Sequence, residues 1–184
     1  MGTPFTAIYN RFLNKVTDDM YLELTPEDTL RDLQNLLIDA LPYFEFPRQP
    51  LENYTIKTEE KPVASLSLSD FIISQNENTA IVDNSYFDAS LTSEEINIIA
   101  TLMMINWTQR QITSIENMRM KYSGTDFKMT SQANHLAKLL SLLEELHRQS
   151  HHIQRLYKRR KLDTNGQYVS NWSIFKNGTG NVGD

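Results

Sequence analysis

Two long helices joined by a short turn, over residues 93–161, constrain the fold of this chain more than any other feature. The first is predicted to begin at Thr92–Glu95, which has the spacing of a capping box, and to end near Lys121. Gly124 lies in the turn, where a glycine suits a left-handed helix end. The second helix is predicted over about 131–161. The first helix would be ~42 Å long. Two such helices side by side are too narrow to bury their own apolar side chains. The hairpin is therefore predicted to pack against other surfaces.

Two shorter helices are predicted before the hairpin, and both show the same start signal. Thr3 and Thr25 are predicted N-caps, and each is followed by a proline at the first helical position, Pro4 and Pro26. Pro42 is predicted to end the second helix, because proline lacks the N–H that a helix interior requires.

Residues 42–91 change in character and are predicted to form an extended or β insertion. Prolines space out aromatic side chains over 42–62, which favours a segment lying in a groove of this chain or of a partner. The run SLSLSDFII over 65–73 then alternates serine with leucine, as expected for a half-buried strand. A second short strand is predicted over 80–87, so the insertion is interpreted as a β-hairpin or an extended arm.

The predicted fold class follows from these elements. The chain is expected to be mainly α, a helical bundle built on a long antiparallel helical hairpin, with the small β-hairpin or extended-arm insertion. One domain is predicted over 1–161, followed by a flexible C-terminal tail over 162–184.

The tail carries large apolar side chains among glycine, asparagine and serine. Such anchors in a polar segment favour ordering on binding, with a disordered terminus as the alternative. The predicted docking residues, for a partner protein, are Tyr168, Trp172, Ile174 and Phe175.

Charge is spread unevenly along the chain. Residues 17–60 hold eleven acidic and three basic side chains, 3 − 11 = −8, and residues 121–161 hold nine basic and three acidic ones, 9 − 3 = +6. The two regions can attract each other within one chain or between neighbouring copies. The predicted inter-subunit electrostatic contacts are Arg155, Lys158, Arg159, Arg160 and Lys161. Contact with DNA phosphate and a favourable interaction with the helix dipole are the alternatives for this basic run.

The residues that carry chemistry are few. Cysteine is absent, which excludes disulfides, thiolate metal sites and a cysteine nucleophile. His147 and His151 are one helical turn apart, but no third metal ligand is indicated, so a solvated helix face is the better interpretation. Gly178–Gly183 spells the dinucleotide fingerprint without a helix after it. No enzyme activity, cofactor, metal or membrane span is expected, and no signal peptide is recognised.

Several stretches resemble virion structural proteins of tailed bacteriophages, of the kind found in the neck between portal and tail. The matching parts cover about two-thirds of the chain: YLELTPEDTLRDLQNLLIDALPYFEFPR, Thr92–Glu95, Trp107–Arg110, the run MKYSGTDFKMTSQ, and LYKRRK at Leu156–Lys161. The similarity is one of overall residue pattern, and no catalytic or binding motif is part of it. The insertion at 63–89 departs from smaller proteins of this group.

The resemblance implies a head-to-tail connector, or adaptor. Such proteins are mostly helical and assemble as a ring, usually of twelve copies, under the portal. Their arms and tails bind the portal, other neck or tail proteins, or neighbouring copies, and genomic DNA passes through without sequence-specific binding. The implied location is the virion neck, with assembly in the host bacterial cytoplasm. The alternatives are a phage helical nucleic-acid-binding or regulatory protein, and a different neck or tail-completion component.

Overall fold

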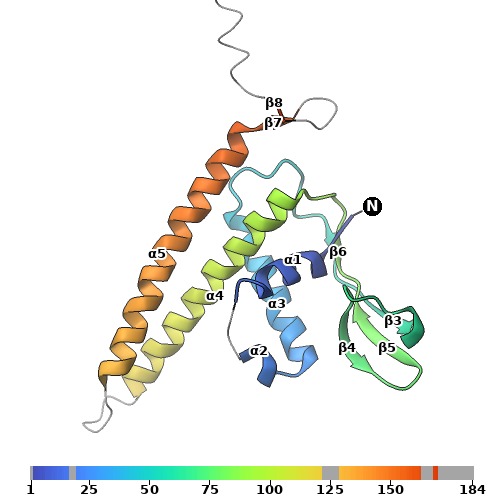
Figure 1. Cartoon of the computed structure of the whole chain (residues 1–184), viewed down its shortest axis with the longest axis horizontal. Coiled ribbons are helices and arrows are strands. Elements are labelled where there is room, and N and C mark those ends of the chain that lie inside the picture. The colour runs from blue at the N-terminus through green and yellow to red at the C-terminus, as the bar shows by residue number, and fades with distance from the viewer. Residues whose placement is uncertain (1, 17–19, 122–128, 163–167, 170–184) are drawn as a thin grey trace, which may run out of the picture.

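The computed structural model describes residues 2–16, 20–121, 129–162 and 168–169 (Figure 1). The described helices are α1 (Phe5–Leu13), α2 (Met20–Glu23), α3 (Pro26–Ala40), α4 (Ser93–Lys121) and α5 (Met129–Arg159), with 3₁₀ turns at Leu41–Tyr43 and Val63–Ser65. The described strands are β1 (Thr3–Pro4), β2 (Tyr54–Thr55), β3 (Thr58–Pro62), β4 (Phe71–Gln75), β5 (Thr79–Asp83), β6 (Tyr86–Phe87), β7 (Lys161–Leu162) and β8 (Tyr168–Val169).

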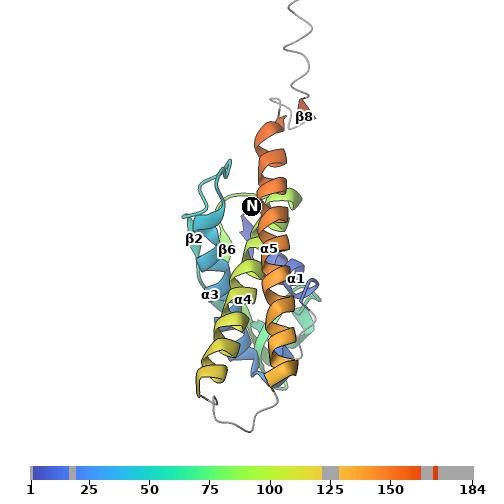
Figure 2. The same cartoon turned by 90° about the vertical axis from the view of Figure 1, so that its left-hand side faces the viewer.

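Helix α4 is the centre of the helical part. It packs against α1 and α3 on one side and against α5 on the other (Figure 1). The helices α4 and α5 lie side by side in both views and run in opposite directions (Figures 1 and 2).

Two three-stranded antiparallel sheets accompany the helices, and β7 and β8 form a separate two-stranded pair after α5. In one, β6 lies between β1 and β2, and in the other, β5 lies between β3 and β4. Strand β6 therefore joins the start of the chain, at Thr3, to a strand that begins fifty-one residues later, at Tyr54.

The predicted fold class is wrong. The chain is not a mainly α helical bundle with a small insertion, because the two sheets are integral to it. The rings of Phe5 in α1 and Phe87 in β6 pack against each other at a tilt of 46°, with centroids 4.7 Å apart, and both are fully buried. The main core thus spans a helix and a sheet, which makes this an α and β protein.

The errors have physical causes. Strands of two residues leave no period in the sequence, so β1, β2 and β6 are too short to be recognised. Strand β3 is TEEKP, whose charged residues and proline are unfavourable in strands. The alternating serines and leucines at 65–69 lie outside strands, and Leu68 is fully exposed. The strand predicted over 65–73 is correct only for its last residues, which begin β4 at Phe71. The predicted turn near Asn76 does connect two paired strands, β4 and β5.

The predicted helix starts had mixed outcomes. Thr25 caps α3, accepting a hydrogen bond from the Asp28 backbone N–H at 3.1 Å, as predicted. The capping box at α4 is also confirmed, because Thr92 and Glu95 exchange hydrogen bonds. Thr3 is wrong as a cap: it belongs to β1, and its side chain accepts from the Leu91 backbone N–H at 2.7 Å.

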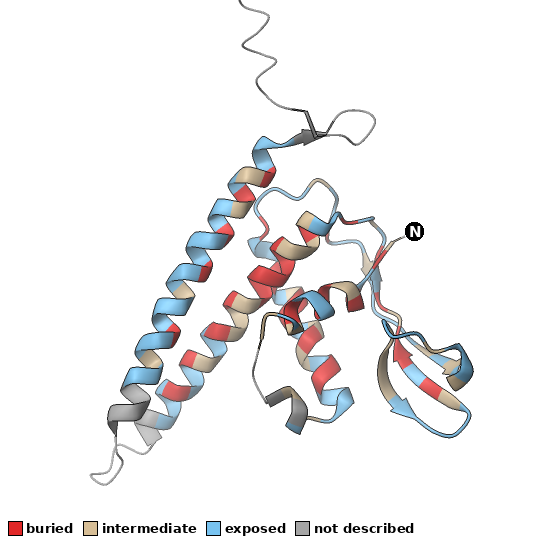
Figure 3. Cartoon of the chain, in the orientation of Figure 1, coloured by how far each residue is buried: buried red, intermediate tan, exposed pale blue. Residues whose placement is uncertain are grey.

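Burial divides the hairpin into two halves (Figure 3). In the first half of α4, from Ile98 to Ile105, almost every side chain is buried. In the second half, Ile112 and Ile115 are the buried side chains among those described, up to Met118, and they meet Leu139 of α5 in a small separate cluster. Below, the near half means residues 93–108 with 147–159, and the far half means residues 109–121 with 129–146.

Candidate functional site

The near half is closed by a junction centred on Tyr157. Its side chain is 1% exposed, and its hydroxyl donates a hydrogen bond to Glu95, which is 2% exposed. Burial, and then the hydrogen bond to Glu95, raise the pKa of Tyr157. Because Glu95 also caps α4 through Thr92, the last turns of α5 are fixed to the first turn of α4. The junction therefore has a structural role.

Arg48 holds the segment after α3 against the same point. Its guanidinium lies over the Tyr157 ring, 4.1 Å from the ring centroid, and it donates to the backbone carbonyls of Tyr157 and Arg160. The Arg48 backbone N–H donates to the Tyr157 hydroxyl at 3.2 Å, and the Phe44 ring meets Tyr157 edge-on. The proline-spaced segment thus lies in a groove of its own chain, one of the two predicted settings.

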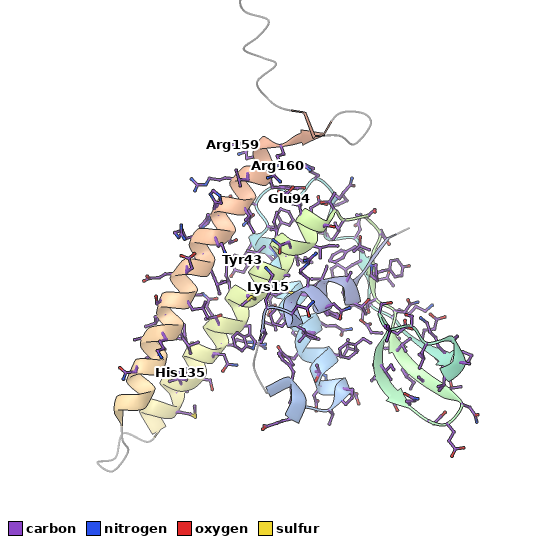
Figure 4. All side chains as sticks on the ribbon, viewed as in Figure 1. Lys15, Tyr43, Glu94, His135, Arg159 and Arg160 are labelled. Carbon is purple, nitrogen blue, oxygen red and sulfur yellow. The ribbon has the colours of Figure 1, made fainter. Side chains whose placement is uncertain are left out.

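The predicted inter-subunit cations make contacts within the chain. Arg160 donates to Glu94 at 2.7 Å, and both lie at one end of the hairpin (Figure 4). The Lys158 ammonium lies 3.8 Å from the centroid of the Phe46 ring. Arg155 is exposed and donates to the His151 carbonyl in its own helix. The side chain of Lys161 lies outside the described residues, and Arg159 is exposed on the last turn of α5. The role of this run between subunits stays a prediction.

The predicted docking residues of the tail are mostly outside the description. Trp172, Ile174 and Phe175 lie beyond the described residues, and of Tyr168 only the backbone is described, in β8. Their binding role also stays a prediction.

Two neighbouring cavities, which share four lining residues, open between the helices. A near cavity of about 230 Å³ lies between α4, α5 and the segment after α3, and its lining includes Leu102 and Gln154. A far groove of about 940 Å³ lies between α3 and the second half of α4, and its lining includes Ile38 and Met118. Tyr43 lines both and is 61% exposed; Figure 4 shows it beside the middle of α4.

Asn106 forms part of the wall of both cavities. Its side-chain nitrogen is buried, and among the described residues it has no hydrogen-bond acceptor. A buried donor without a partner costs about 1–3 kcal/mol, so a ligand that supplies a carbonyl oxygen there gains affinity. Sequence reasoning missed Asn106, because an asparagine inside an apolar helix carries no local signal of what faces it.

The histidines on α5 line the near cavity without forming a metal centre. The rings of His147 and His151 are stacked with centroids 6.5 Å apart, and His151 Nδ1 lies 3.4 Å from a Glu45 carboxylate oxygen. No group of three or more potential ligands that could hold a metal occurs in the described part of the chain.

The last residue of strand β5, Asp83, is a buried acid in the sheet formed by β3, β4 and β5. Asp83 is 4% exposed, and one of its carboxylate oxygens accepts two hydrogen bonds from Ser85 while the other has no partner among the described residues. Burial raises the pKa of Asp83, and the two bonds from Ser85 partly oppose that shift. Burial, and then the charge of Asp83, raise the pKa of Tyr9, whose hydroxyl is also unpaired there.

Helix α5 is mostly exposed along its described length, with a narrow buried stripe (Figure 3). Leu140 is 44% exposed and Leu142 is 39% exposed, on the two sides of this stripe. The side chains that are buried instead are Leu139 and Leu146. The sequence places leucines at 139, 140, 142 and 143, so periodicity alone leaves the facing stripe open.

No protein-family model, curated protein or solved structure matches this chain. The resemblance to phage neck proteins therefore remains a prediction. Among the described residues, none of the helices is both long enough and apolar enough to span a membrane.

Proposed function

We propose that this chain is a structural virion protein of a tailed phage, forming an adaptor ring in the neck that joins portal to tail and lets DNA pass. The observation that carries the proposal is the one-sided packing of α5. Over its described side chains this helix buries a narrow stripe and leaves Leu140 and Leu142 open to solvent. These two leucines lie about 200° apart around the helix, so they flank the buried stripe on its two sides. In this proposal, neighbouring proteins cover the rest of the helix and the two exposed leucines with it.

The position of the second apolar surface supports repeated assembly. The far groove, with Ile38 and Met118, lies between α3 and α4, whereas the exposed leucines lie on α5. When two different surfaces of one subunit meet on successive copies, the contact is heterologous and closes into a ring if the rotation allows. The twelve copies implied by the resemblance belong to this proposal.

Charge supports the same arrangement. Arg155 is exposed on α5, and α3 exposes Glu27, Asp28 and Asp39 on a separate element. Attraction between such surfaces on neighbouring copies sets orientation and weakens with salt. In this proposal the tail residues contact the portal, and the channel passes DNA without reading its sequence.

The test is assembly, measured by size-exclusion chromatography with light scattering, alone and with the cognate portal protein, followed by electron microscopy. A ring with a central channel, alone or on the portal, is the expected result. A monomer that ignores the portal and binds duplex DNA tightly at physiological salt would contradict the proposal and favour the nucleic-acid-binding alternative.

Charge reversal sharpens that test. The triple variant Arg155→Glu, Arg159→Glu, Arg160→Glu should weaken assembly, and it should reduce the sensitivity of assembly to salt. Arg160→Glu also breaks the contact with Glu94, so Arg155→Glu alone serves as the variant that leaves the junction intact. Unchanged assembly and unchanged salt dependence in both variants would remove the electrostatic part of the proposal.

A further inference from the structure

The strands β2 and β3 are two parts of one continuous strand. Its register against the opposite strand, which contains β6 and β5, runs from Tyr54 opposite Phe87 to Pro62 opposite Thr79. Both strands advance by the same number of residues between these pairs (62 − 54 = 87 − 79 = 8), so no residue is inserted where the two sheets meet. Residues 54–62 therefore form one long strand that crosses both three-stranded sheets.

The outer edge of this strand has no partner strand among the described residues. The sheet orders are β1-β6-β2 and β3-β5-β4, so both of its parts lie at an edge. The backbone carbonyls of Asn53 and Lys57 accept hydrogen bonds from the opposite strand, so odd-numbered residues point inward. Successive residues of an antiparallel strand direct their backbone groups to alternate sides. The backbone groups of Ile56, Thr58 and Glu60 therefore point outward.

This edge is open to solvent. Four successive residues, from Thr55 to Thr58, are exposed, and Ile56 is 50% exposed. The sheet that contains β3 projects from the helical part of the protein (Figure 1). A long open edge is a template for pairing with a further strand, because each outward N–H and C=O group can bond to it.

The side chains of this edge discriminate between the registers in which two copies could pair. Charged residues and proline commonly protect a strand edge. Here Pro62 lies at an outward position, where its missing N–H ends an added ladder. A two-fold axis at Lys57 would place two lysines opposite each other, and an axis at Glu59 would place two glutamates opposite each other. Both arrangements are destabilising.

An axis at Thr58 pairs opposite charges instead. Lys57 of each copy then lies opposite Glu59 of the other copy, so the favourable pair occurs twice. An axis at Ile56 leaves the charged side chains without opposite charges across from them, and an axis at Glu60 places two glutamates opposite each other. Charge complementarity therefore favours one two-fold register over its neighbours.

We propose that two copies of this chain pair through this edge, antiparallel about a two-fold axis at Thr58, to form one shared sheet. Residues 55–61 of each copy take part, and the ladder ends where Pro62 meets Tyr54. The two threonines at the axis make a favourable cross-strand pair. Because the strands are antiparallel, the two helical parts lie at opposite ends of the shared sheet. The pair uses neither α5 nor the far groove, so the inference goes beyond the proposed ring and does not depend on it.

A single engineered cysteine tests the position of the axis, because the full-length chain contains no cysteine of its own. In Thr58→Cys the two thiols face each other across the axis. The Cα atoms of such a pair are about 5.5 Å apart, which a disulfide can span. The purified full-length variant should form disulfide-linked dimers under mild oxidation.

The matched control is Glu60→Cys, at an exposed and outward position of the same strand. In the proposed register Glu60 lies opposite Ile56, so the two engineered thiols are four residues apart, about 13 Å. Linked dimers of this variant should form at least about tenfold more slowly, because the effective concentration of one thiol near the other is lower. Equal rates, or no linked dimer of Thr58→Cys, would overturn the proposal and leave the edge to a strand of another protein.

Charge exchange tests the register independently. Lys57→Glu places glutamates opposite each other, and Glu59→Lys does the same with lysines, so each should weaken dimerisation at least about tenfold in analytical ultracentrifugation. Mixed in equal amounts, the two variants should pair with each other, and the double variant Lys57→Glu, Glu59→Lys should pair with itself. Urea denaturation checks the fold of each, since Glu59 also accepts from Asn84 at 2.7 Å. A mixture that does not associate would overturn the register.

The pair and the ring can fail separately. Thr58→Pro removes an outward N–H that the strand's own sheet does not use, so it should abolish the pair and leave ring assembly on the portal protein intact. Rings without linked dimers of Thr58→Cys would retain the proposed function and overturn this inference. Linked dimers without rings would support this inference and count against the proposed function.

Discussion

The two halves of the hairpin use the same kind of helix in opposite ways. In the near half, α4 is covered by α1, α3 and α5, and its polar groups are joined by the junction of Arg48, Glu95 and Tyr157. In the far half, α4 meets α5 through the three-residue cluster around Ile112. Stability is therefore expected to be concentrated in the near half, and surface available to partners in the far half.

The largest expected effect compares one substitution in both halves. Ile99→Ala, at a fully buried site in the near half, should lower the free energy of unfolding by about 3–4 kcal/mol, since methylenes are lost and a cavity remains. Ile115→Ala, at 8% exposure in the far half, should cost about 2 kcal/mol or less, because that site can collapse. Urea denaturation measures both. Equal losses would show that the halves are equally tightly packed.

The junction should be the next most sensitive feature. Tyr157→Phe removes the hydroxyl that donates to Glu95 and leaves a buried carboxylate with one partner fewer. The expected loss is about 2 kcal/mol by urea denaturation, because hydrogen bonds to charged groups are the stronger ones. Tyr43→Phe, at an exposed tyrosine, is the control and should change stability little. If Tyr157→Phe leaves the free energy of unfolding unchanged, the stability of the near half comes from its apolar packing alone.

Asp83 tests whether the sheet of β3, β4 and β5 contains a destabilising buried charge. Burial raises its pKa in the folded chain, so the charged form is disfavoured there and stability is lost as pH rises through that folded pKa. Asp83→Asn should therefore stabilise the chain by about 1 kcal/mol at pH 7, while keeping an oxygen for the bonds from Ser85. The gain should vanish below about pH 4, where the acid is protonated in both states. Thermal unfolding of both proteins over a range of pH measures this gain in stability. A gain that does not depend on pH would show that it does not come from removing the buried charge.

The smallest stability effect is expected at Leu140 in the far half. Leu140→Ser should change the free energy of unfolding by no more than about 0.5 kcal/mol, because the side chain is largely exposed. Leu139→Ser, one residue earlier and buried, is the matched control and should be clearly destabilising. Leu140→Ser should nevertheless weaken self-association or portal binding, measured by light scattering. If it leaves assembly unchanged, the outer face of α5 is not an interface.

The sequence determined the helix boundaries better than the sheets. Thr25 and the Thr92–Glu95 box were predicted correctly because capping is local: donor and acceptor lie within one turn. Thr3 shows the same local signal, but its side chain accepts a hydrogen bond from Leu91, 88 residues later in the chain. No local pattern in the sequence predicts such a contact.

The same distinction separates the parts of the candidate site. The aromatic and proline residues near Arg48 suggested a groove, but the partner, Tyr157, lies 109 residues later in the chain. Asn106 and the cavities depend on how three separate elements meet, so they became visible only in the folded chain. Sequence reasoning identified segments with unusual composition, and the structure was needed to show which surfaces they contact.

The position of β1 has a consequence for how the protein is made. Thr3 pairs with Phe87, so the first sheet is complete only when nearly ninety residues have left the ribosome. At about 5–20 residues per second, that takes on the order of 5–20 seconds. The apolar face of α1 packs against β6 and α4, neither of which has yet been synthesised. The first segment of this protein therefore cannot reach its native packing until those later residues have been added.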